Sequence, residues 1–153
     1  MDKKIESLKR TRENLLNFIN DLTTDQLNEI PAGFNNNIIW NLGHLLASQQ
    51  GICYTRAGLD KKIKEQYFTD YKPETKPQGY VDSLVLDELK KLFLSLIELF
   101  ELDFNNNQFS SYPTWTTRYG MVITNIDEAI TFVLFHEGLH LGYIMALKRL
   151  VTK

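Results

Sequence analysis

Hydrophobic residues recur with the period of an α-helix in four segments of this 153-residue chain. In the third segment Val85, Leu89, Leu92, Leu96 and Phe100 form one stripe, and charged residues occupy the opposite side. The four segments span about residues 3–21, 37–54, 82–102 and 125–150. Four long amphipathic helices in a chain of this length predict an all-α fold, namely a four-helix bundle that forms a single domain over residues 1–153.

Two connections between these segments are long, at about residues 55–81 and 103–124. Both contain turn residues and aromatic side chains, so we expect them to pack over the bundle, and connections of this length are often functional. The stretch SYPTWTTRYG, residues 111–120, places Arg118 shortly before the last helix. Its guanidinium is a candidate receptor for an anionic group of a substrate or thiol cofactor; the alternative is a plain surface loop.

Charge and composition exclude several classes of function. The net charge of −2 gives no reason to expect nucleic-acid binding, which requires a concentrated basic surface. The N-terminal stretch MDKKIESLKR lacks the apolar core of a signal peptide, and no apolar run is long enough to predict a membrane span. The one cysteine, Cys53, cannot form an internal disulfide and is interpreted as a packing residue on the apolar side of its helix. We therefore expect a cytoplasmic protein without a membrane partner.

The motif HEGLH, residues 136–140, suggests a metal site. His136 and His140 are four residues apart and share one helix face, which also carries Val133 and Ile144. Two imidazoles buried in an apolar face need polar partners, and one shared metal ion would satisfy both. The alternative is a pair of core histidines that form hydrogen bonds with neighbouring groups.

The third histidine, His44, lies on a stripe of its helix that is separate from the apolar face. This stripe consists of Trp40, Asn41, His44, Ala47, Ser48 and Gly51. Small side chains beside His44 would leave a cavity, so Trp40, Asn41 and Ser48 are candidate pocket residues. In the alternative, the stripe faces solvent and Trp40 anchors the end of the bundle. If His44 faces the other two histidines, the three form a metal site with open coordination positions, as in catalytic sites.

H-E-x-x-H is also the signature of zinc metalloproteases, whose third ligand usually lies downstream. Only LGYIMALKRLVTK follows His140, and it contains no His, Asp or Glu, so the protease interpretation fails. Glu137, which corresponds to the general base of those proteases, lies at the edge of the ligand face. As a candidate catalytic residue it would orient a ligand or accept a proton; the alternative is an ion pair with a lysine or arginine.

The stretches NIIWNLGHLL and FHEGLHLGYIMALKRL resemble the DinB-like superfamily, and the resemblance covers essentially the whole chain in length, helix order and histidine placement. It implies a four-helix bundle with metal ligands at His44, His136 and His140, and it favours a homodimer. Many relatives have a histidine where this chain has Asn41. Characterised members include transferases that use bacillithiol or mycothiol, which implies a small-molecule substrate.

Three neutral imidazoles leave a bound divalent ion with its full charge, so an open position favours thiolate or hydroxide. Zinc or nickel is the expected metal, and iron(II) or manganese also suits nitrogen ligands. We therefore expect a metal-dependent thiol S-transferase that joins a low-molecular-weight thiol to small electrophiles. The alternatives are a non-catalytic stress-response or binding module with a vestigial or sensor metal site, a metal-dependent hydrolase, and a protein that has lost its metal.

Gly138 and Gly142 lie four residues apart on the helix face opposite the histidines. Each glycine costs roughly 1 kcal/mol of helix stability relative to alanine, so a packing reason is expected. The glycines would allow close approach of a long loop or of a second subunit.

Overall fold

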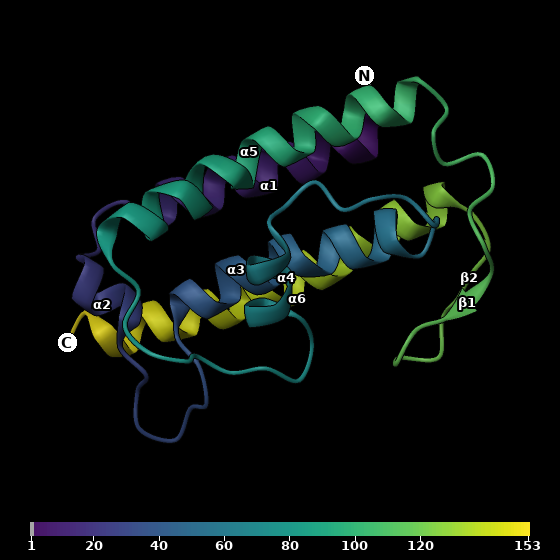
Figure 1. Cartoon of the computed structure of the whole chain (residues 1–153). Helices are drawn as coiled ribbons and strands as arrows, with labels where there is room; N and C mark the ends of the chain where they lie inside the picture. Colours follow the sequence, from purple (N-terminus) through teal and green to yellow (C-terminus); the bar gives the residue numbers. More distant parts are fainter. Residues whose placement is uncertain (1) are drawn as a thin grey trace.

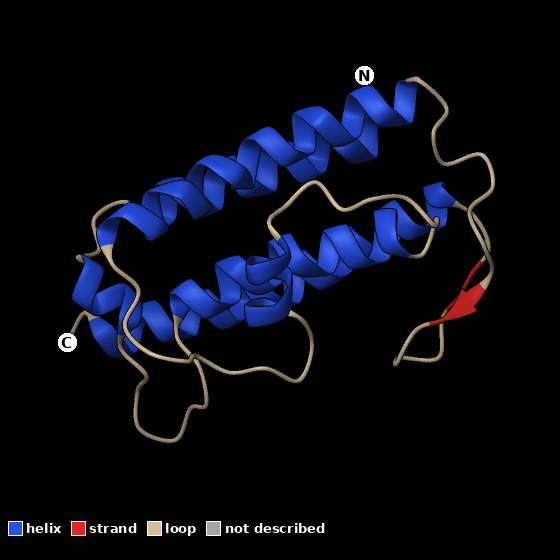
Figure 2. Cartoon of the chain, in the orientation of Figure 1, coloured by secondary structure: helices blue, strands red, loops and turns tan. Residues whose placement is uncertain are grey.

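Each long helix begins after an Asp or Asn whose side chain accepts a hydrogen bond from a backbone N–H group of the first turn. The computed structural model describes residues 2–153 (Figures 1 and 2). The long helices are α1 (Lys3–Phe18, cap Asp2), α3 (Ile38–Gln50, cap Asn37), α5 (Ser83–Asn105, cap Asp82) and α6 (Ile126–Val151, cap Asn125). The all-α prediction is confirmed, with helix boundaries close to the expected ones.

The long helices pack so that each contacts two of the others. Figure 1 shows α1 beside α5 and α3 beside α6, and α1 also contacts α6 while α3 contacts α5. The main core cluster combines residues of all four helices, including Leu15, Leu42, Phe93 and Ile144. Helix α3 lies innermost, because every residue from Ile38 to Gln50 is buried.

The two long connections contain short elements that no periodic signal predicted. The first holds α4 (Glu65–Tyr71), which packs on α3, and the second holds an antiparallel hairpin of β1 (Trp115–Thr116) and β2 (Val122–Ile123). Helix α3 continues directly into a π-helical turn, η1 (Gly51–Thr55). Elements of two to seven residues are too short to show a hydrophobic period in the sequence.

The first helix ends at Phe18 rather than at residue 21 as predicted. Lys148 of α6 donates from Nζ to the Phe18 carbonyl (2.6 Å) and to Asp21 Oδ1 (2.8 Å), which satisfies the end of α1. Thr23 then caps a separate helix, α2 (Thr24–Asn28), through a reciprocal capping box with Gln26.

Helix α6 is long and apolar enough to cross a membrane by length and composition alone, with a mean hydropathy of 1.4 over 18 residues, 33% of them buried. No apolar run long enough for a membrane span was expected from the sequence. His136, Glu137 and His140 interrupt the apolar residues of α6, but the mean hydropathy over the 18 residues is still that of an apolar segment. Helices in protein cores pass the same test, and α6 contacts both α1 and α3.

Cys53 lies in a second core cluster and is 1% exposed. Burial raises the pKa of its thiol to about 12, so the thiol stays protonated at neutral pH. Both observations fit its interpretation as a packing residue.

Candidate metal centre

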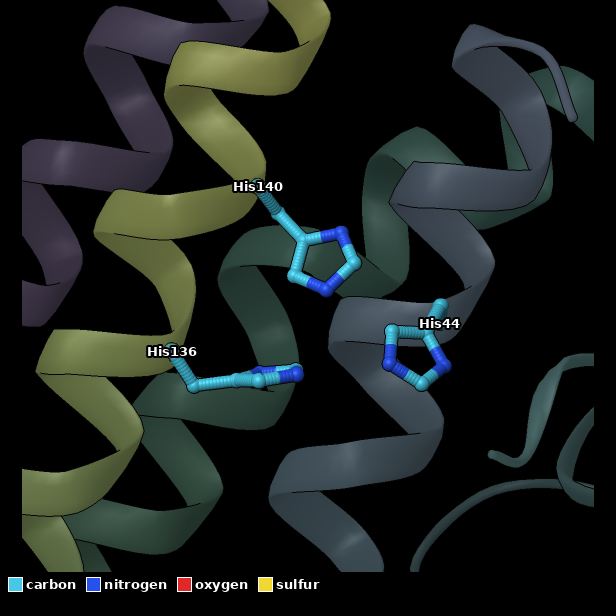
Figure 3. A group of neighbouring side chains, drawn as sticks. All are labelled: His44, His136 and His140. Carbon is cyan, nitrogen blue, oxygen red and sulfur yellow. The ribbon is translucent and has the colours of Figure 1, made fainter. Parts of the chain in front are cut away.

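The three histidines meet between α3 and α6 (Figure 3). His44 projects from α3, and His136 and His140 project toward it from successive turns of α6. The ring centroids lie 4.5 to 5.1 Å apart, and one nitrogen of each ring lies within 4.8 Å of the other two. Three imidazole nitrogens at this separation fit one divalent metal ion as a common ligand set.

Hydrogen bonds fix which nitrogen two of the rings present to the site. His44 Nδ1 donates to the Tyr71 carbonyl (2.8 Å), and His140 Nδ1 donates to Asn41 Oδ1 (2.7 Å). The amide orientation of Asn41 follows from its own donor, Nδ2, which bonds the Asn37 carbonyl (2.8 Å) and Asn36 Oδ1 (3.0 Å). Because Nδ1 carries the proton in both rings, the Nε2 atom of each has the lone pair that a metal needs. In the structure the Ser48 hydroxyl, 3.3 Å away, donates to Nε2 of His44.

Gly43 positions the acceptor of His44. A Cβ atom at residue 43 would overlap the Tyr71 ring, so only glycine allows α4 to pack this closely on α3. That close packing brings the Tyr71 carbonyl to His44. On its other side, His44 is covered by Trp40, whose ring stacks on the imidazole at 4.6 Å with an interplanar angle of 11°.

Burial keeps the imidazoles neutral. Together with the smaller effect of the neighbouring histidines, burial lowers the pKa of His136 to about 3 and of His140 to about 4. Burial also lowers the pKa of His44, against the opposing effect of its hydrogen bond to the Tyr71 carbonyl. Neutral imidazole is the form that binds a metal, so the site needs no proton release from these rings at neutral pH.

A pocket of about 830 Å³ opens onto the three imidazole rings. The candidate residues Trp40, Ser48 and Arg118 line this pocket. Ala47 and Gly51 also line it, and because they fill little space they leave room for the cavity. Asn41 departs from the prediction. It is fully buried and lies outside the pocket lining, because its side chain is held behind His140 by the hydrogen bonds described above.

Two arginines line the pocket where the hairpin and η1 meet. Arg56 lies over the Trp115 ring, with its guanidinium carbon 3.6 Å from the ring centroid. Arg118 contributes to the lowered pKa of His44 and His136, so its positive charge acts on the site. Within residues 2–153 neither arginine forms an ion pair with a carboxylate. The pocket therefore offers two positive charges to a ligand.

Glu137 points away from this pocket into the core. It is 1% exposed, and Arg12, which is 0% exposed, donates to it from Nε (2.9 Å) and Nη2 (2.5 Å). Arg12 also donates from Nη1 to the Phe93 carbonyl (3.0 Å). Burial raises the pKa of the Glu137 carboxyl, and the Arg12 charge opposes this. The geometry thus matches the alternative role, a structural ion pair, and does not place Glu137 where a catalytic base would act.

Sequence reasoning missed three residues that shape the site. Arg12 interrupts the buried stripe of α1 between Leu8 and Leu15, and a charge at such a position signals a buried partner. Gly43 in the middle of a helix signals close packing. Arg56 lies two residues after the end of the predicted helix, and nothing in the sequence distinguishes it from a surface arginine.

A family model matches most of the chain. The model described as DinB superfamily matches residues 7–144, a range that contains all three histidines. No curated protein matches the chain.

Proposed function

The chain belongs to the DinB superfamily, and on this premise we propose that it is a metal-dependent thiol S-transferase that acts on small electrophiles. We also propose that α1, α3, α5 and α6 form a four-helix bundle. His44, His136 and His140 would hold the metal, and zinc or nickel suits their nitrogen donors, as do iron(II) and manganese. A reducing cytoplasm would supply the low-molecular-weight thiol.

The observation that supports this function best is the open pocket above the three imidazoles. A structural metal site is closed by four protein ligands, whereas three histidines beneath a pocket of about 830 Å³ leave room for a small molecule. A metal ion bound there would lower the pKa of a thiol at its open position, so that thiolate forms near neutral pH.

The chain's own groups would bind and orient the reactants. Arg118 and Arg56 would receive an anionic group of the thiol or of the electrophile, and the aromatic wall formed by Trp40, Trp115 and Phe132 would exclude water. In the reaction a sulfur–carbon bond forms as the leaving group departs with its electron pair, and the thiol proton passes to solvent. The buried Glu137 takes no part in this sequence.

The first test is the metal content of protein purified without an affinity tag, compared with a His44→Ala/His136→Ala/His140→Ala variant. About one divalent ion per chain is expected, lost in the triple variant and retained in Cys53→Ala, which removes the chain's one thiol without touching the imidazoles. Protein that contains no metal and does not take up added zinc or nickel would refute the site.

The second test is the addition of low-molecular-weight thiols to chromogenic electrophiles by the metal-loaded protein. The rate is expected to exceed that of the triple histidine variant. Metal-loaded protein that accelerates no thiol addition would contradict the transferase proposal. Hydrolysis of esters or amides instead would identify a hydrolase, and no turnover at all would favour a sensor or binding module.

A further inference from the structure

The pocket above the three histidines extends along α3 on both sides of the metal site. Trp40, His44 and Gly51 line it in this order along the chain. At 1.5 Å rise per residue, Trp40 lies about 6 Å from His44 along the helix axis, and Gly51 lies about 10 Å from it in the other direction. The metal site therefore separates two parts of the pocket, which we call the Trp40 end and the η1 end.

The two ends of the pocket carry opposite charges. Arg56 and Arg118 line the η1 end, next to the hairpin. Glu74 lines the Trp40 end, and it is the one carboxylate among the described residues of the lining. A ligand that fills the pocket therefore meets a negative charge on one side of the metal site and two positive charges on the other.

The direction of α4 brings Glu74 to the Trp40 end. Phe68 of α4 lies 3.5 Å from the place that a Cβ atom of Gly51 would take, and Tyr71 lies against Gly43. Helix α4 therefore runs antiparallel to α3 along the pocket. The chain leaves α4 close to the start of α3, where the segment with Glu74 follows.

Glu74 has a backbone conformation that glutamate rarely adopts. Its φ is 69°, in a turn that the Thr75 N–H (3.3 Å) and hydroxyl (2.7 Å) close by donating to the Lys72 carbonyl. Pro73 takes the second position of this turn, and Gly or Asn is usual at the third because of its positive φ. Trp40 Nε1 donates to Thr75 Oγ1 (3.1 Å) and holds the turn at the pocket. Strained residues are concentrated at functional sites, which indicates a role for the Glu74 carboxylate.

The Glu74 carboxylate is free to bind a ligand. The residue is exposed, and within residues 2–153 its carboxylate forms no ion pair. A carboxylate in this state can bind the ammonium group of a small molecule. It would also offset the repulsion between that group and a divalent ion at the histidines.

The thiol fits the η1 end better. Arg118 contributes to the lowered pKa of His44 and His136, so its charge acts at these two rings. The same charge favours a thiolate over a neutral thiol beside them. A thiol that binds the arginines through an anionic group leaves the Trp40 end for the second reactant.

We propose that the electrophile of this transferase carries an ammonium group, which binds Glu74 at the Trp40 end while the thiol binds the arginines at the η1 end. This inference rests on the proposed function, and it makes Glu74 a residue that determines the choice of substrate. In the reaction the thiol proton passes to solvent and the sulfur forms a bond to a carbon of the electrophile. The leaving group departs with the electron pair of the bond that breaks. Glu74 positions the electrophile and exchanges no proton.

Binding of a small ammonium ion to the metal-free protein tests the Glu74 site without turnover. Propylammonium is titrated while the NMR signals of the Trp40 indole N–H and the Thr75 amide are followed. Glu74→Gln keeps the length of the side chain and removes its charge, so the dissociation constant is expected to rise about fivefold, the upper range for an exposed ion pair. The neutral counterpart, 1-propanol, should bind equally to both proteins.

Glu65→Gln is the matched control for this titration. Glu65 is an exposed carboxylate of α4 that pairs with Lys61 at 3.1 Å and does not line the pocket. The control should bind propylammonium as the native protein does. Equal binding of propylammonium by the native protein and by Glu74→Gln would overturn the proposal.

Glu74→Gly tests the strain at this position. Glycine adopts a φ of 69° without strain, so the melting temperature is expected to rise by about 2–4 °C. Propylammonium binding should weaken as in Glu74→Gln. A Glu74→Gly protein that is less stable than the native one would show that the carboxylate serves the fold, which also overturns the proposal.

Turnover by the metal-loaded protein tests the choice of electrophile. With 3-mercaptopropionate as the thiol, 2-bromoethylamine is compared with 2-bromoethanol. Glu74→Gln should lower kcat/KM about fivefold for 2-bromoethylamine and leave kcat/KM for 2-bromoethanol unchanged. An equal effect on both electrophiles would overturn this inference alone. Propylammonium binding that depends on Glu74, without turnover of either electrophile, would refute the transferase and leave the ammonium site in place.

Discussion

Replacing Glu137 with alanine is expected to destabilise the protein without removing its metal site. Arg12 is 0% exposed, and the substitution would leave its guanidinium in the core with the Phe93 carbonyl as its one hydrogen-bond acceptor. Breaking a buried ion pair from one side costs about 3–5 kcal/mol. Since each kcal/mol shifts the melting temperature of a domain this size by about 2–4 °C, the expected decrease is on the order of 10 °C.

The assay is thermal and urea unfolding followed by circular dichroism, with metal content measured in parallel. Arg10→Met is the matched control, because Arg10 pairs with Glu13 at 3.4 Å on the exposed side of the same helix, where a change below about 0.5 kcal/mol is expected. The double variant Arg12→Met/Glu137→Leu should recover most of the lost stability, since it replaces both charges with apolar groups.

Two results would refute this reasoning. A Glu137→Ala protein as stable as the native one would show that the ion pair does not hold the core. If the Glu137→Ala protein keeps its stability but loses thiol-transfer activity, Glu137 would have the catalytic role that the H-E-x-x-H spacing suggests.

Three further predictions concern the site. Asn41→Ala should weaken metal affinity by about 10–100-fold in competition with a chelator, because His140 loses the acceptor that fixes its Nδ1 proton; unchanged affinity would remove that role. Arg118→Gln should raise KM for acidic thiols with little change in kcat, while an equal effect on neutral thiols would argue against charge recognition. In the metal-free protein the stability contributed by keeping His136 and His140 neutral is complete above pH 6.5, their ordinary pKa. It is lost as the pH falls below 6.5 toward the folded values of about 3 and 4, and a constant urea midpoint over this range would contradict the neutral state.

The long helices could be read from the sequence because each combines a hydrophobic period with a cap. Asn125 illustrates this: it precedes the periodic segment, and its side chain accepts a hydrogen bond from the Glu128 N–H (3.0 Å) in the first turn of α6. Helical spacing placed His136 and His140 on one face, and the resemblance to the DinB-like superfamily implied His44 as the third ligand; the structure brings the three together.

The contacts around the metal site could not be read in this way. The hydrogen-bond partner of His44 is the backbone carbonyl of Tyr71. Every residue has a backbone carbonyl, so the sequence does not indicate which one His44 contacts. The partner of Glu137 is 125 residues away on α1, so helical spacing could place Glu137 at the edge of a face but could not choose between the pocket and Arg12. Asn41 was assigned to the pocket because it shares a stripe with His44, and the fold directed its side chain to His140.

The metal ligands lie far apart in the chain, since His44 belongs to α3 while His136 and His140 belong to α6, and α1 and α5 contribute none. A bound ion would therefore act as a cross-link between the second and last long helices, and it would favour the folded chain by mass action. At a free metal concentration of 100 times Kd this adds about 2.7 kcal/mol to the free energy of unfolding. Metal-loaded molecules would then resist proteolysis for longer than metal-free ones. The amount of the protein in a cell would therefore rise and fall with the availability of the metal.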